Sequence, residues 1–182
     1  MLELLHFLDS ILPIFVILTF AKATYEYIKG QKWKKSEFLS KEIKDFFDDE
    51  DIKLVCSLLD WNSRKVKIDD KVILVTDELL ISSLKTHNIK SQFTKDEACI
   101  RDLFDNFFDK MSYFNIHIKN SLIDEKEVLN YLTYYIDILH TPGRKPIELV
   151  KIFEKYIEYY DYSNMIELVN RHKKYRRILS FT

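Results

Sequence analysis

The sequence of 182 residues contains only two glycines, Gly30 and Gly143. Phosphate-binding loops, dinucleotide-binding turns and EF-hand calcium loops need glycine at fixed positions, because their backbones adopt positive φ angles or approach the ligand closely. Two isolated glycines cannot meet those spacings. The sequence therefore excludes nucleotide and calcium sites of the glycine-dependent kinds.

Cysteine is equally scarce, and the two present, Cys56 and Cys99, lie in apolar segments far apart in the chain. This usage predicts small buried side chains in a reducing compartment rather than a disulfide framework. Cys99 also lies near the start of a predicted helix, a position that favours a thiolate nucleophile. An enzyme in which Cys99 meets a histidine in space is therefore kept as an alternative.

Familiar catalytic motifs are missing as well. The five histidines are scattered, with no H-x3-H pair and no H-E-x-x-H motif, and the sequence has no G-x-S-x-G elbow. Arg101 and Asp102 resemble the start of the R-polar-x4-H motif of HEPN ribonucleases, but Phe107 stands where the histidine would be. We therefore predict no catalytic residue, no metal ion, no cofactor and no enzymatic activity.

The longest apolar segment is at the N-terminus, between Leu4 and Ile28. Its charge-free part runs from Ser10 to Ala21, and flanking residues bring it to the ~20 residues of a spanning helix. We predict that residues 1–30 form a transmembrane helix that anchors the protein to a lipid bilayer. The predicted anchor residues are Leu12, Ile14, Phe15, Val16, Ile17, Leu18 and Phe20.

The residues that follow this segment are typical of a membrane interface. They are Tyr25, Lys29, Lys32, Trp33, Lys34 and Lys35. Lysines on this side predict an N-terminus outside and a cytoplasmic C-terminal domain, at the inner or plasma membrane. Two alternatives stay open: a signal peptide cleaved near residues 21–23, and an apolar helix buried inside a soluble oligomer.

Residues 31–182 have the pattern of a cytoplasmic α-helical bundle, centred on the segment Phe93–Ile123. Thr94 and Glu97 form a T-x-x-E capping box at the start of this helix. Its inward face is apolar at spacings of three and four residues, whereas Arg101 and Asp105 belong to the outward face. The predicted inward residues are Ile100, Leu103, Phe104, Phe107, Phe108, Met111, Phe114 and Ile118.

One short segment, 66–76, has strand character instead. Its alternating and β-branched residues predict a small β-hairpin that turns at Asp69 and Asp70. A loop leading into a helix at 77–86 is the alternative. Further helices are predicted before and after, with a break at Thr141–Pro146. The predicted fold class is thus mainly α, with one small β-hairpin near 66–76.

Charge is nearly balanced over the whole chain, with 28 basic and 29 acidic residues, so there is no general attraction to nucleic acid or anionic lipid. The basic stretch 171–177 is the exception. Its candidate contacts to phosphate groups are Arg171, Lys173, Lys174, Arg176 and Arg177. The alternative is a solvated helix end whose cations complement the helix dipole.

Four short sequence segments after the apolar segment carry a resemblance to known proteins. They are WKKSEFL at 33–39, LLDWNSRKV at 58–66, FTKDEACIRDLFDNFFDKM at 93–111 and SLIDEKEV at 121–128. Together they resemble small single-pass bacterial membrane proteins with a helical cytoplasmic domain. That resemblance implies location and architecture, and carries no active-site residue.

The function that we predict is a membrane-anchored helical module for self-association or binding of a protein partner. By analogy with other single-pass proteins of this size, the pathway would be a bacterial stress or antiviral system. The alternatives are a nucleic-acid-binding protein that uses the basic C-terminal helix, and an enzyme without a recognisable motif.

Overall fold

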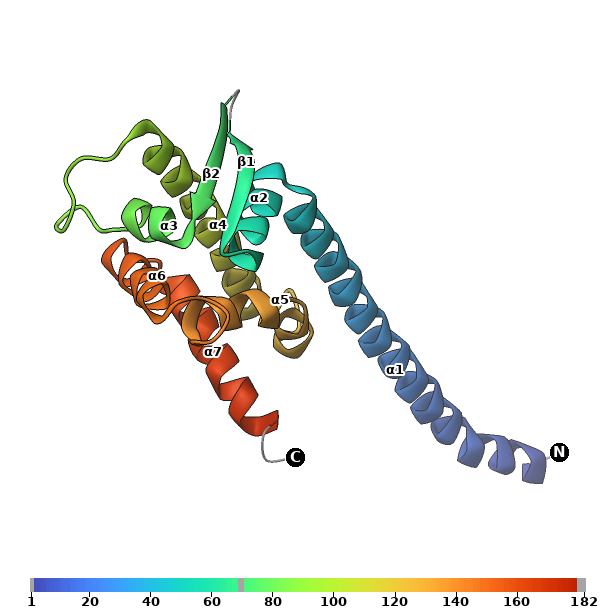
Figure 1. Ribbon diagram of the computed structural model, residues 1–182. Helices are drawn as coiled ribbons and strands as arrows, with labels where there is room; N and C mark the ends of the chain where they lie inside the picture. Colours follow the sequence, from blue (N-terminus) through green and yellow to red (C-terminus); the bar gives the residue numbers. More distant parts are fainter. Residues whose placement is uncertain (1, 69–70, 180–182) are drawn as a thin grey trace.

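The computed structural model describes the backbone of residues 2–68 and 71–179, and the side chains of residues 13–67 and 71–177. Within these residues, helices predominate and the two strands form one antiparallel hairpin (Figure 1). The helices are α1 (Leu2–Asp48), α2 (Glu50–Asp60), α3 (Asp77–Ser83), α4 (Lys95–Lys119), α5 (Glu125–His140), α6 (Ile147–Tyr159) and α7 (Ser163–Leu179). The strands are β1 (Ser63–Ile68) and β2 (Lys71–Thr76). The mainly helical fold class is confirmed.

Helix α4 is the centre of the packed domain, as its apolar face predicted. It contacts α2, α3 and α7, and the side chains of Phe104, Phe107 and Phe108 are completely buried. The ring of Phe104 stacks on that of Phe153 from α6, at a centroid distance of 5.7 Å. Burial of such rings gives the main apolar stabilisation of the domain.

Helix α1 differs from the others because only its C-terminal part belongs to this core. Leu39, Ile43 and Phe46 are buried, whereas the helix runs without interruption through Gly30 toward its N-terminal end. Figure 1 shows that end (blue) extending away from all the other elements. The domain therefore has a helical arm, formed by residues 13–35 of α1.

The β-hairpin near 66–76 is confirmed, with β1 starting three residues earlier than predicted. The register pairs Ser63 with Thr76 and Val66 with Ile73. The first residues of β1 are polar and exposed, so they gave no apolar periodicity to detect. The predicted turn residues Asp69 and Asp70 lie outside the described residues.

One residue of α4 was placed wrongly by the helical pattern. Arg101 was predicted to face outward, but its side chain is buried. Its guanidinium donates hydrogen bonds to the carbonyl oxygens of Ser83 (2.9 Å) and Lys85 (2.8 Å), and to the hydroxyl of Tyr160 (2.8 Å). His87 also lies beside it, 3.5 Å away. Arg101 therefore joins the segment after α3 to the end of α6, which explains its burial.

The capping box of α4 is confirmed and is part of a larger buried network. The Thr94 hydroxyl accepts from the Glu97 amide (3.2 Å), and the Thr94 amide donates to the Glu97 carboxylate (2.9 Å). Ser82 and Lys90 donate to the same carboxylate. Burial alone would raise the pKa of Glu97, but these hydrogen bonds outweigh burial and lower that pKa to about 2.

This network predicts a defined acid sensitivity. Because the pKa of Glu97 is lower in the folded chain than its ordinary 4.5, its contribution to stability is full above pH 4.5 and is lost as pH falls toward about 2. We expect Glu97→Gln to lower the free energy of unfolding at pH 7 by about 2–3 kcal/mol and to flatten its pH dependence in that window. Urea unfolding at several pH values measures both effects. Glu37→Gln, at an exposed site on α1, is the control and should leave the pH profile unchanged.

A second buried charge pair lies between the start of α3 and the loop before α6. The Lys145 ammonium lies 2.7 Å from the Asp77 carboxylate and donates to the Trp61 carbonyl, also at 2.7 Å. The Lys145 side chain is completely buried and that of Asp77 is 8% exposed. A pair in this position is costly to break because one charge stays behind without its partner.

We therefore expect Lys145→Ala to lower the free energy of unfolding by about 3–5 kcal/mol. The exposed Lys151 on α6 provides a matched lysine, and Lys151→Ala should change stability by less than about 0.5 kcal/mol. Urea denaturation of both variants at pH 7 makes the comparison. Equal stability of the two variants would show that the pair has no structural role.

Candidate functional site

The arm exposes the predicted anchor residues to solvent. Side chains from residue 13 to residue 29 are all exposed, and the large apolar ones are more than half exposed. They are Ile14 (56%), Phe15 (63%), Val16 (62%), Ile17 (67%), Leu18 (61%) and Phe20 (74%). Because successive residues point in directions about 100° apart, this run covers every side of the helix with apolar surface.

An apolar surface of this kind needs a partner that removes it from water. A helix that is apolar all round is normally buried in a protein core or in a membrane. Within the described part of the chain, no other element covers residues 14–20 (Figure 1). The exposed apolar segment is therefore the strongest candidate for a functional surface.

The described side chains cover residues 13–28 of the predicted span. No helix in the described portion of the chain combines the length and the apolar character that crossing a membrane requires. Leu12 and the rest of the predicted span from residue 4 to residue 12 have side chains outside the described set. The backbone of these residues continues α1 without a break.

The predicted interfacial residues lie where the arm approaches the domain. Tyr25, Lys29, Lys32, Trp33 and Lys34 are exposed, and Lys35 is half-buried. A cavity of about 420 Å³ separates this part of α1 from the start of α5, and its walls carry opposite charges. The lining residues are Tyr27, Ile28, Gln31, Lys32, Lys35, Asp124 and Glu127. Aromatic rings and lysines thus follow directly after the apolar segment.

The basic stretch at the end of the chain is divided by acidic partners. The Arg171 guanidinium lies 2.6 Å from Glu125 and 2.9 Å from Glu167, and Arg176 lies 3.7 Å from Asp137. These ion pairs tie α7 to α5 and neutralise part of the positive charge available to a phosphate.

The other predicted contacts of this stretch, Lys173, Lys174 and Arg177, are exposed. Within the described residues, the stretch is therefore a mixed surface of exposed cations and ion pairs. Such a surface gives less support to nucleic-acid binding than a uniform basic face would.

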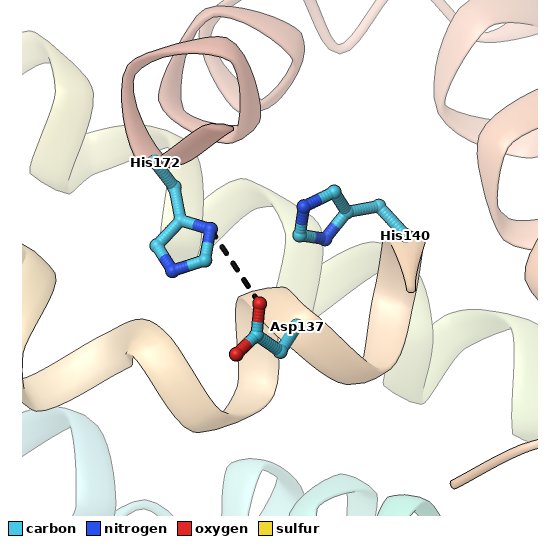
Figure 2. A group of neighbouring side chains, drawn as sticks. All are labelled: Asp137, His140 and His172. Carbon is cyan, nitrogen blue, oxygen red and sulfur yellow. Dashed lines mark ion pairs between the residues drawn. The ribbon is translucent and has the colours of Figure 1, made fainter. Parts of the chain in front are cut away.

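The same region holds a cluster that the sequence patterns missed. Asp137 and His140 lie one turn apart on α5, and His172 comes from α7, with the three side chains directed toward one another (Figure 2). One donor atom from each lies within 4.8 Å of the others. The signal in the sequence was a D-x-x-H pair at 137–140, but nothing in the sequence joined it to His172.

The cysteines are not combined with this cluster. Cys56 is buried, as predicted, and burial raises the pKa of its thiol to about 11. Cys99 is half-buried on α4. Neither thiol forms a disulfide. No observation on the described residues places Cys99 in a catalytic arrangement with a histidine.

Comparison with models of protein families, with curated proteins and with solved structures gave no match for this chain.

The exposure of the arm predicts that the domain is stable without it. We expect a chain that lacks residues 1–30 to keep its helical circular-dichroism spectrum and to have a free energy of unfolding within about 1 kcal/mol of the full chain, measured in detergent. Leu39, which is 1% exposed, provides the contrast within the same helix. Leu39→Ala should cost about 2–5 kcal/mol because it leaves a cavity in the core. A truncated chain that unfolds would show that the arm is part of the domain.

Proposed function

We propose that this protein is a membrane-anchored helical module, in which residues 4–28 enter a lipid bilayer and residues 31–182 form a cytoplasmic domain for self-association or for binding a protein partner. The observation that carries the proposal is the run of exposed apolar side chains at Ile14–Leu18 and Phe20. The proposal agrees with the resemblance to single-pass bacterial membrane proteins noted above.

The apolar run is large enough to drive insertion. Complete burial of one large apolar side chain contributes about 1.5–3 kcal/mol. Six such side chains, already more than half exposed, would together gain on the order of 10 kcal/mol on leaving water. Residues 13–21 have no ion pair or hydrogen bond to another described element that would have to break on leaving water. The Thr19 hydroxyl donates to the Phe15 carbonyl of its own helix, so it stays paired in a bilayer.

The proposed span of residues 4–28 is also long enough to cross a bilayer. A continuous helix over residues 4–28 would be about 38 Å long at 1.5 Å per residue, against a hydrocarbon core of about 30 Å. Asp9 and Lys22 would then lie toward the two interfaces, where water reaches charged groups.

The proposed orientation follows from the lysines after the segment. Lys29, Lys32 and Lys34 are exposed on the domain side of the apolar run, together with Tyr25 and Trp33. Lysines close to a membrane helix favour the cytoplasmic side, and tyrosine and tryptophan favour the headgroup level. The domain would therefore lie at the cytoplasmic surface of the inner or plasma membrane.

The test replaces part of the apolar run with charge. We expect the triple variant Ile14→Lys, Val16→Lys, Ile17→Lys to lose membrane association, because three lysines near the middle of the segment cost several kcal/mol in hydrocarbon. Membrane fractionation with a carbonate wash measures the association of the variant and of the unchanged chain.

A matched control changes three apolar side chains of the domain that are also more than half exposed. Val72, Leu74 and Ile89 are 63%, 53% and 58% exposed, so their combined replacement by lysine should leave the protein in the membrane fraction. Light-scattering mass in detergent then reports self-association. A full chain that is soluble and oligomeric without detergent would contradict the proposed anchor and show that the arm packs against further copies.

A further inference from the structure

We propose that Asp137, His140 and His172 form a binding site for one divalent transition-metal ion of the Zn²⁺ type. Two imidazoles and one carboxylate are a donor set that such ions accept. The site joins α5 to α7 (Figure 2) and lies outside the arm, so the inference does not rest on the proposed membrane anchor.

The hydrogen bond made by His140 leaves its Nε2 free to bind a metal ion. Its Nδ1 lies 2.6 Å from the carbonyl oxygen of Ile136, so Nδ1 carries the hydrogen and donates it. The lone pair is therefore on Nε2, the usual metal-binding atom when the other nitrogen donates to a backbone carbonyl. In Figure 2 the ring of His140 is directed from the end of α5 toward His172.

His172 provides the second, independent observation. Its side chain is completely buried, yet neither ring nitrogen has a hydrogen-bond partner among the described residues. Asp137 Oδ1 lies 3.8 Å from Nδ1, which is too distant for a hydrogen bond. Buried polar groups without partners are uncommon in folded proteins. A metal ion between these two atoms would give Nδ1 of the imidazole a partner and hold the carboxylate.

The protonation of both histidines favours binding. Burial disfavours the charged form of both imidazoles and lowers the pKa of His140 and of His172. An uncharged imidazole is the form that coordinates a metal ion.

The three donor atoms need to move only slightly closer together to bind one zinc ion. Donors at about 2.0–2.1 Å from a tetrahedral zinc ion are about 3.3 Å apart, and the three donor atoms here lie within 4.8 Å of one another. Asp137 and His140 are half-buried at the protein surface and can move toward His172 by side-chain rotation. Three protein ligands leave one position open for water or another ligand.

The surroundings of the site are basic. Arg176 lies 3.7 Å from Asp137 Oδ2, the oxygen that does not face His172, and so can hold the carboxylate in place. Asp137 and His140 line a cavity of about 440 Å³ together with Arg144, Lys173 and Arg176. These cations weaken the attraction for a bare metal ion, and they favour an anion at its open position.

The experiment uses the full chain in detergent after removal of metals by a chelator. Titration with Co²⁺ reports the geometry through its visible absorption, and Zn²⁺ competition with calorimetry gives the affinity and stoichiometry. We expect one ion per chain. Asp137→Asn and His140→Gln should each raise the Zn²⁺ dissociation constant at least tenfold.

Two controls test whether the loss is specific to the cluster. Asp102→Asn and His87→Gln change exposed residues of the same types elsewhere, and should bind Zn²⁺ like the unchanged chain. Circular dichroism verifies that each variant is folded. Asp137 and His140 are chosen because they are half-buried, so replacing them disturbs the core less than replacing buried His172 would. Absence of binding to the unchanged chain, or equal affinity in the Asp137 and His140 variants, would overturn the proposal.

Discussion

The contact of Phe46 with α4 is the interaction on which the arrangement of the whole molecule depends. Its ring lies 5.4 Å from that of Phe114 and 6.0 Å from that of Phe107, near the C-terminal end of α1. Together with the contact between Phe38 and His117 of α4, it fixes the direction of the exposed arm relative to α4. The same aromatic cluster continues through Phe104 to Phe153 on α6, so one core holds both the arm and the C-terminal helices.

Ion pairs reinforce the apolar packing in the C-terminal half of the domain. Arg171 pairs with acids on α5 and α7, and Asp137 faces Arg176. Because these pairs are partly exposed, each contributes modestly on its own. A metal ion bound by Asp137 and His172 would add a stronger link between the same two helices. The basic stretch at 171–177 thus has a structural explanation that its composition alone did not suggest.

The sequence was informative wherever a local pattern decided the structure. The apolar spacing of α4, its Thr94–Glu97 cap and the alternating β2 strand depend on neighbours a few residues apart. Contacts between residues far apart in the sequence could not be predicted from such local patterns. Arg101 is buried because carbonyl groups from another segment receive it, and Lys145 meets Asp77 from 68 positions away. His172 reaches Asp137 by helix packing, which no spacing rule contains.

The unbroken course of α1 has a mechanical consequence. From residue 14, directly after Pro13, to Asp48 the helix is a rod of about 52 Å without a further proline, and no side chain lies against Gly30. Rotation or tilting of its outer end would therefore be transmitted to the domain with little loss. A lever of this length converts a tilt of 10° into a displacement of about 9 Å at the far end. If the outer end of the rod is held in place, the tilt of α1 would set the direction in which the domain faces.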